Sequence, residues 1–277
     1  MARIRRKLFH TYANLDLPIQ WQDPVVEAWA SGKNISTRRD CMAVTSTDQS
    51  LRGNKSLKVF PEFKWFTGVK KLYGSMFNSC DSLTHIELPD SLTSIGDNAF
   101  YDCKSLTSIS LPDSLTSIGS YYVFRGCTKL ENIDLSHVTS LTGWWAFQIC
   151  TSLKSVYLPE CLDVDHQAFE SCTSLKTVIM PKVKNIGYRP FGNCTSLERL
   201  DLPASVTNIW NDAFLGCTAL KVITIAATTP PALDTTALRG QSAEFYVPDD
   251  AVETYKAASG WSAYASRIHP MSECPSE

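Results

Sequence analysis

The stretch between Cys80 and Phe100 decides the fold because it returns along the chain. It reads Cys80-Asp-Ser-Leu-Thr-His-Ile-Glu-Leu-Pro-Asp-Ser-Leu-Thr-Ser-Ile-Gly-Asp-Asn-Ala-Phe100. A phenylalanine also precedes each recurring cysteine at a constant spacing. In-register copies of this length predict a repeat architecture. The cysteine recurs at nearly equal intervals, at Cys103, Cys127, Cys150, Cys172, Cys194 and Cys217.

Each copy predicts one short strand and a second extended segment. Ile86 and Leu88 alternate with polar neighbours, which is typical of a half-buried strand. One such strand cannot bury its apolar face alone, but stacking the copies builds a parallel sheet over a continuous core. The interval between cysteines lies in the range of leucine-rich repeats. We therefore expect an α/β-type leucine-rich-repeat solenoid, rich in β-structure, with short helical or 3-10 turns and helical caps at both ends.

The ten cysteines fit this stack better than they fit a disulfide scaffold. Stacking places seven thiols one coil apart, where they behave as small apolar groups. Their side chains should run parallel rather than face each other, which disfavours disulfides. We expect a reduced, buried ladder. Cys41, Cys161 and Cys274 lie outside it; Cys161 stands near a core position and should also be buried, and the oxidation state of these three stays open.

Three regions are predicted along the chain: an arm and helical cap over 1–50, the solenoid over 51–228, and a capping segment over 229–277. Asp23-Pro24 should start a helix that Gly32 ends. Asp249 or Asp250 should cap a short C-terminal helix. Trp261 can then cover the last coil.

The chain resembles the BspA-like leucine-rich repeat family of bacterial surface proteins. The resemblance rests on Cys-x-x-Leu-x-x-Ile-x-Leu-Pro and Ser-Leu-x-x-Ile-Gly-x-x-Ala-Phe, over about residues 57–228. It implies an adhesive, host-protein-binding role without chemistry of its own. Many relatives also carry, near the N-terminus, an acidic loop between two helices that looks like a calcium-binding loop. Here that loop lacks alternating carboxylates, and Arg39 stands where a bidentate glutamate would be expected, so we predict no calcium and no cofactor.

Composition and motifs give no sign of catalysis. The five histidines are scattered, no Cys-x-x-Cys occurs, and no glycine-rich phosphate loop or nucleophile elbow is present. We predict no catalytic and no metal-binding residues. A net charge of −2 on 277 residues indicates neither nucleic acid nor an anionic membrane as partner, and no apolar run is long enough to span a bilayer.

The N-terminus leaves the localisation open. Met1–Lys7 is basic, but His10, Asn14 and Asp16 interrupt the stretch that follows, so no signal peptide is predicted. The basic residues and the polar arm to about residue 20 could be an attachment segment. The family implies a cell-surface or secreted protein, whereas the lack of a predicted signal peptide favours a virion or appendage component made in the cytoplasm.

Two outward surfaces are candidate binding sites. On the strand side, Tyr157 and Ile179 project apolar bulk among polar Ser155, Thr177 and Arg199; single exposed apolar residues are also normal on any surface. The second surface is an aromatic line before each phenylalanine, whose rings could stack on sugars or simply thicken the core. It contains Tyr121, Tyr122, Trp144, Trp145, His166, Tyr188 and Trp210.

The expected function is a non-catalytic ligand-binding scaffold, with a protein ligand and an adhesive role at a surface. One alternative is a structural or receptor-binding component of a virion or appendage. Another is a carbohydrate-binding module that uses the aromatic line. The ligand and the oligomeric state are not predicted, because exposed residues of a solenoid vary without constraint from the fold.

Overall fold

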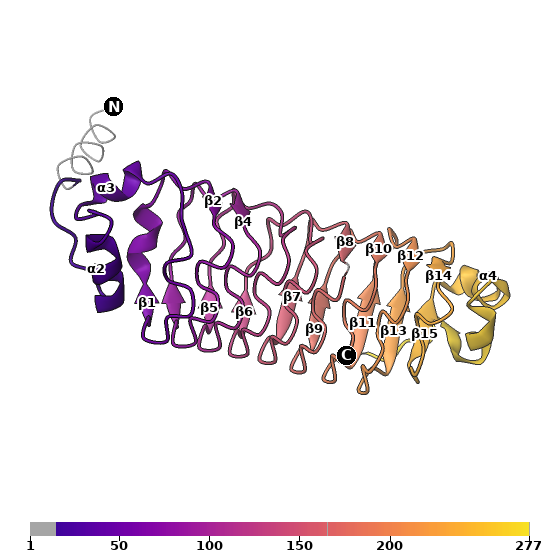
Figure 1. Cartoon of the computed structure of the whole chain (residues 1–277). Helices are drawn as coiled ribbons and strands as arrows, with labels where there is room; N and C mark the ends of the chain where they lie inside the picture. The colour runs from indigo at the N-terminus through magenta and orange to yellow at the C-terminus, as the bar shows by residue number, and fades with distance from the viewer. Residues whose placement is uncertain (1–14, 165, 277) are drawn as a thin grey trace, which may run out of the picture.

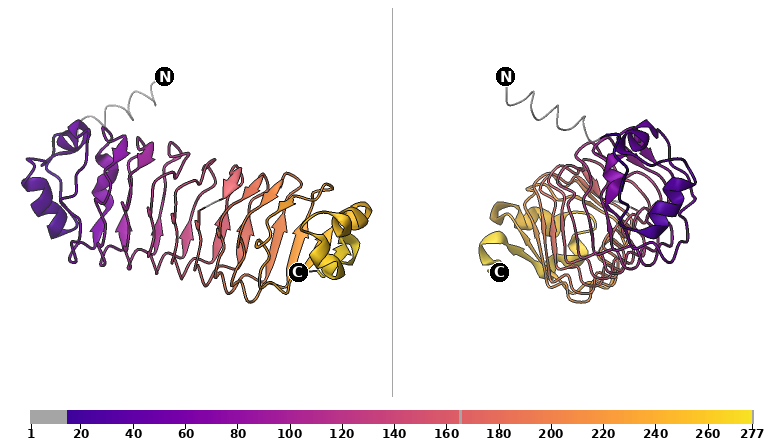
Figure 2. Two further views of the ribbon diagram at one scale, coloured as in Figure 1. Left: turned by 45° about the vertical axis from the view of Figure 1, so that its right-hand side comes forward. Right: turned by 90° about the vertical axis from the view of Figure 1, so that its left-hand side faces the viewer.

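The chain forms an elongated stack of coils with helices at each end (Figure 1). The computed structural model describes residues 15–164 and 166–276. The basic segment Met1–Lys7 considered as an attachment segment lies outside the described residues. Figure 2 shows the stack turned and almost end-on, with the coils following one another behind the N-terminal helices. The predicted leucine-rich-repeat solenoid is confirmed, and the helical caps are small.

One strand per coil forms the strand sheet, which runs along one side of the molecule. The strands at Ser155–Tyr157 and Thr177–Ile179 each bury their middle residue and expose the two others, as the period-2 pattern predicts. Neighbouring strands are parallel and in register, so Tyr157 lies opposite Ile179. Pairing continues past residue 228. The strands are β1 (Val59–Phe60), β3 (His85–Ile86), β5 (Ser108–Ile109), β6 (Asn132–Ile133), β7 (Ser155–Tyr157), β9 (Thr177–Ile179), β11 (Arg199–Leu202), β13 (Val222–Ile225), β15 (Glu244–Val247) and β16 (Ile268–Pro270).

A second line of short strands follows the Leu-x-x-Ile phrases on another side of each coil. Isolated bridges from Ser117 to Ser140 and from Leu141 to Val164 carry this line where no full strand forms. The second extended segment of each copy is therefore also confirmed. Its strands are β2 (Lys71–Leu72), β4 (Ser94–Ile95), β8 (Asp163–Val164), β10 (Asn185–Ile186), β12 (Asn208–Ile209) and β14 (Ala232–Leu233).

A stack of phenylalanine rings fills the centre of the coils. Successive ring centroids lie 5.2 to 6.2 Å apart and the ring planes differ by 5° to 15°. All these rings are fully buried, so each coil shares its core with the coils on both sides. The stack consists of Phe77, Phe100, Phe124, Phe147, Phe169, Phe191 and Phe214.

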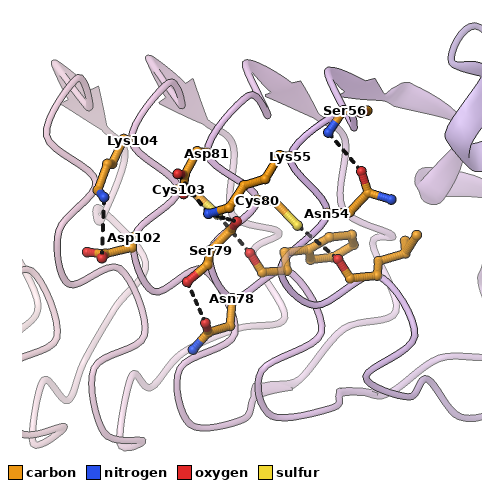
Figure 3. A network of polar contacts seen from close by, with 12 residues as sticks. Asn54, Lys55, Ser56, Asn78, Ser79, Cys80, Asp81, Asp102, Cys103 and Lys104 are labelled. Carbon is orange, nitrogen blue, oxygen red and sulfur yellow. Dashed lines mark hydrogen bonds and ion pairs between the residues drawn. The ribbon is translucent and has the colours of Figure 1, made fainter.

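The seven repeated cysteines are buried, and they hydrogen-bond from coil to coil. Each Sγ donates to a backbone carbonyl of the preceding coil at 3.0 to 3.2 Å. Figure 3 shows the first two, Cys80 and Cys103. In the last coil the side-chain amide of Gln241 donates to the carbonyl of Phe214 and takes the place of the thiol. The ladder and the burial of Cys161 are as predicted, and all ten thiols are free.

Helices close the N-terminal end. Asp23 starts the first one by accepting a hydrogen bond from Val25 N at 2.8 Å, and its other oxygen accepts from Lys58 N at 2.7 Å, which ties the cap to the first coil. The predicted start at Asp23 and end at Gly32 are confirmed. Arg39 pairs with Asp16 at 2.5 Å. The elements are α2 (Pro24–Ser31), α3 (Arg38–Ala43) and η1 (Pro61–Trp65).

Trp261 covers the C-terminal end of the stack. Its indole Nε1 donates to the carbonyl of Pro231 at 2.8 Å, and its ring packs edge-on against Phe245 with centroids 5.7 Å apart. The tryptophan is fully buried, so its predicted covering role is confirmed. The surrounding elements are η2 (Asp249–Ala251), α4 (Val252–Ala257), η3 (Ser262–Arg267) and η4 (Met271–Glu273).

The prediction that Asp249 or Asp250 caps the C-terminal helix is wrong. The helix α4 starts directly from the 3-10 turn η2, and no side chain caps it. The carboxylate of Asp249 instead accepts a hydrogen bond from Ser272 N at 3.0 Å. The returning chain supplies a backbone amide to this carboxylate, which is therefore not used at the helix start.

Candidate binding surfaces

The strand sheet brings its five predicted residues to one outward face. Ser155 lies opposite Thr177, and Tyr157 lies opposite Ile179 across β7 and β9. Arg199 belongs to β11, which contacts β9 in the next coil. In Figure 1 these three strands follow one another along the stack. The sequence therefore identifies this face correctly, and what it binds stays a prediction.

Tyr157 and Ile179 form one apolar patch. The two residues lie side by side on neighbouring strands. They are 50% and 47% exposed. A shallow groove of about 350 Å³ adjoins Ile179 on the side where the strands end. Apolar side chains line most of this groove, so the patch and the groove form a continuous apolar surface. The lining includes Met180, Pro181, Leu202, Pro203 and Ala226.

Arg199 is engaged by the protein itself. Its Nε donates to Asp201 Oδ1 at 3.0 Å, and its Nη1 donates to the carbonyl of Pro275 at 3.0 Å. The C-terminal segment thus returns to the strand sheet at β11. Arg199 anchors this segment at the edge of the apolar patch.

The aromatic residues before the phenylalanines occupy two columns instead of one line. Tyr122 and Trp145 lie two positions before their phenylalanine and have positive φ angles of 59° each. Tyr121, Trp144, His166 and Tyr188 lie three positions before theirs. Backbone hydrogen bonds keep the coils in this register: Tyr122 N donates to Trp144 O, and Trp145 N donates to His166 O.

The faces of these rings pack against each other. Tyr122 and Trp145 stack with centroids 4.9 Å apart and planes 10° apart. Trp144 and His166 stack at 4.6 Å, and Tyr121 meets Trp144 edge-on at 5.8 Å. A sugar stacks on an open ring face, whereas these rings direct faces toward neighbouring coils. The interpretation in which the rings thicken the coil is therefore the one that this packing favours.

Trp210 does not belong to either column. It lies four positions before Phe214, at the place that Tyr73 has before Phe77. The spacing in sequence from Tyr188 to Trp210 equals the spacing from His166 to Tyr188, and this regularity suggests a continuous line. The step from Phe191 to Phe214 is longer by a single position, however, and this moves Trp210 out of register. Its side chain is 56% exposed.

A polar column directly after four successive phenylalanines was missed by the sequence reasoning. Arg125 Nη1 donates to the Tyr101 hydroxyl at 2.6 Å, and Arg125 Nε donates to Gln148 Oε1 at 2.5 Å. Gln148 Nε2 donates in turn to Glu170 Oε2 at 2.6 Å, and Arg189 pairs with Glu170 at 2.9 Å. The signal that could have revealed it was the run of hydrogen-bonding residues at one repeat position, Tyr101, Arg125, Gln148 and Glu170.

A groove, which we call the turn groove, lies between this polar column and the column of Tyr122 and Trp145. Its volume is about 570 Å³, and it crosses several coils. The walls combine ring edges, side-chain amides and guanidinium groups. The lining residues are Arg52, Asn78, Asn98, Tyr101, Tyr122, Arg125, Trp145 and Gln148.

These surfaces offer hydrogen bonds, ion pairs and apolar contacts to a ligand. Within residues 15–164 and 166–276, no group of three or more histidine, cysteine, aspartate or glutamate side chains is placed to hold a metal ion. The helices in the same ranges are all too short or too polar to cross a bilayer.

Comparison with known proteins finds the same repeat elsewhere. The family model of the BspA type leucine-rich repeat region matches residues 70–164 and 146–235. A Bacteroides ovatus leucine-rich repeat protein is 29% identical with a TM-score of 0.54, over 73% of this chain and 55% of that one. A protein of this class from Eubacterium ventriosum is 26% identical with a TM-score of 0.51, over 55% and 41%.

A third similar structure is the leucine-rich repeat protein of T. pallidum. It is 30% identical with a TM-score of 0.49, and the match covers 56% of this chain and 72% of that one. For the Bacteroides and Eubacterium proteins, the matched region is about half of the length of each protein. A search of curated proteins returns no match.

Proposed function

The chain belongs to the BspA-type leucine-rich repeat family, and we propose that it binds a protein ligand on the strand sheet, around Tyr157 and Ile179. The repeat scaffold is consistent with a role in protein interaction, and proteins of this family and fold are typically non-catalytic. The observation that carries the proposal is the pair of large apolar side chains that are half exposed and directly opposite each other.

The surroundings of this pair match what protein contacts use. Interfaces commonly have an apolar centre, with aromatic anchors, inside a polar rim. Here the rim on the strand side contains Ser155 and Thr177, and Lys176 is exposed without an ion-pair partner among the described residues. The adjoining groove could receive one apolar side chain of the ligand. We therefore expect a ligand segment with an apolar anchor and an acidic neighbour.

A phage-displayed peptide library tests this proposal. Peptides selected on the wild-type chain should carry an apolar anchor. They should bind the Tyr157→Ser/Ile179→Ser double variant at least about tenfold more weakly, since two large apolar contacts of the interface are lost. Tyr73→Ser is a matched control, because Tyr73 is similarly exposed but lies outside the strand sheet. Selected peptides that bind the double variant as tightly as the wild type would refute the proposed site.

We further propose that this binding serves adhesion at a cell surface, as the resemblance to bacterial surface proteins implies. Fractionation of the producing cells tests the location. An adhesin should be accessible to protease added outside intact cells, whereas protection of the whole pool inside the cell would exclude adhesion.

A further inference from the structure

We infer that the turn groove binds an acidic saccharide, a sugar bearing a carboxylate, through the guanidinium of Arg125. This inference is independent of the proposed function, because the turn groove is formed by a different part of each coil than the strand sheet. The groove volume of about 570 Å³ lies within the range of small-molecule sites. The contacts of Arg125 and of its neighbours identify the class of ligand.

Arg125 carries a charge that no carboxylate of the described residues neutralises. Its side-chain hydrogen bonds go to neutral acceptors, the hydroxyl of Tyr101 and the amide oxygen of Gln148. The guanidinium also lies over the rings of Tyr101 and Tyr122, at 5.3 and 5.6 Å from their centroids. These contacts fix its orientation and leave it further N–H groups. A fixed guanidinium fork is suited to a carboxylate, which it can bind with two parallel hydrogen bonds.

The one acidic residue of the polar column is already occupied. Glu170 is almost fully buried, at 6% exposure, and its two oxygens accept from Arg189, Gln148 and Gln167. Its carboxylate therefore forms contacts inside the coils and does not neutralise the groove. Arg52, which is exposed at the other end of the groove, adds a second positive charge. The groove is consequently electropositive, although the whole chain carries a net charge of −2.

Side-chain amides give the groove a second kind of contact. The Asn78 oxygen accepts from the Ser79 hydroxyl at 2.8 Å, as Figure 3 shows, which leaves the amide nitrogen of Asn78 available to a ligand. Asn98 has no side-chain hydrogen bond to a described residue and lines the same groove. Amide groups pair well with hydroxyls because each offers both a donor and an acceptor. A carboxylate next to several hydroxyls is the chemistry of an acidic sugar.

The rings of the groove act as walls in this arrangement. The faces of Tyr122 and Trp145 are turned toward each other, so that their edges border the groove. Recognition therefore depends on the charge and the hydroxyls of the sugar more than on stacking. A neutral sugar should bind much more weakly than an acidic one.

Titration with sodium glucuronate and with N-acetylneuraminate, followed by NMR, tests the inference. The indole N–H signal of Trp145, assigned with Trp145→Phe, should shift saturably for at least one of the two, with a Kd of about 1 mM. The pair also distinguishes uronic from sialic acids as the source of the carboxylate. Glucose and acetate, each with half of the required chemistry, should bind at least about tenfold more weakly.

Variants of the groove complete the test. Arg125→Gln should weaken the binding at least about tenfold, and Arg125→Lys should weaken it too because the fork is lost. Asn98→Gly removes an amide but keeps a backbone that accepts the positive φ of 58°, and should weaken it about threefold or more. Arg239→Gln, at an exposed arginine outside the groove, is the control and should change nothing.

Three results would overturn the inference. One is the absence of a saturable shift with both acidic sugars. Another is equal binding of glucose and glucuronate. The third is unchanged affinity in Arg125→Gln at an unchanged melting temperature; if that variant does not fold, unchanged affinity in Asn98→Gly and Arg125→Lys has the same meaning.

Discussion

Tyr157 on the strand sheet and Trp145 before the Phe147 turn are both large aromatic residues outside the phenylalanine stack, yet they have different surroundings. Trp145 has one face against Tyr122 of the preceding coil, at 4.9 Å. Tyr157 is half exposed, and its direct neighbour Ile179 is also exposed. An aromatic residue at a repeat position can thus belong to the fold or to the surface. Contacts between coils distinguish the two cases, whereas residue type does not.

The largest expected difference between the interior of the coils and the surface concerns the reactivity of the thiols. Burial raises the pKa of the Cys80 thiol to about 11 and that of Cys172 to about 12, so hardly any thiolate is present near neutral pH. Cys274 is only partly buried, next to the strand sheet. Labelling of the native protein with an aromatic disulfide at pH 8 should modify Cys274 at least about 100-fold faster than any repeated cysteine.

Peptide mapping after the labelling identifies the modified residues, and labelling in guanidinium should reach all ten cysteines. Rapid native labelling of Cys103 or Cys150 would show that the coils do not share a closed interior.

A stability comparison should separate Trp145 from Tyr157. We expect Trp145→Ser to lower the free energy of unfolding by about 2 kcal/mol, because the ring stack and its partial burial are lost. Tyr157→Ser should change it by less than about 0.5 kcal/mol, since this side chain is a surface residue. Equilibrium unfolding in guanidinium measures both. Equal losses in the two variants would remove the distinction between the surfaces.

Ile149 offers a gain in stability. It has a positive φ of 63°, which is unfavourable for a β-branched side chain. The equivalent position in another coil has Asn193 with φ of 58°. Ile149→Asn should therefore raise the free energy of unfolding by about 1 kcal/mol, after some loss of partly buried apolar surface. Thermal unfolding checks this, with Ile149→Val, which keeps the branched side chain, as the control that should not gain.

The smallest expected effect concerns Arg199. Its ion pair with Asp201 and its bond to Pro275 lie at the surface, where such contacts contribute little. Arg199→Gln should change the free energy of unfolding by less than about 0.5 kcal/mol. The variant should nevertheless loosen the C-terminal segment, and faster cleavage near residue 272 by added protease would show this. A loss as large as that of a truncated core residue would mean that the segment is part of the core.

The sequence predicts those features that depend on repetition. The period places Cys80 and Cys103 in one ladder and Phe100 and Phe124 in one stack, because each coil must bury its apolar face against the next. The outward positions Tyr157 and Ile179 follow from the period-2 pattern of the strands. Register is enough for these predictions, because every coil repeats the same backbone path.

The features that the sequence could not predict depend on local geometry. The spacing to Trp210 looked regular, but a single additional position before Phe214 changes its place in the coil. The hydrogen bonds of Arg125 connect side chains of three successive coils, and only the structure shows which of them meet. Asp249 likewise finds Ser272 from the returning chain instead of the helix start. The spacing of the repeats does not predict side-chain hydrogen-bond partners of this kind.

Hydrogen–deuterium exchange of the chain with a selected peptide tests the division of surfaces most directly. We predict slower exchange on peptide binding in 154–158 and 176–180, which contain Tyr157 and Ile179, and unchanged exchange in 120–126 and 143–149. Slower exchange confined to 120–126 and 143–149 would contradict this division, because the protein ligand would then dock on the stacked rings that we assign to the fold.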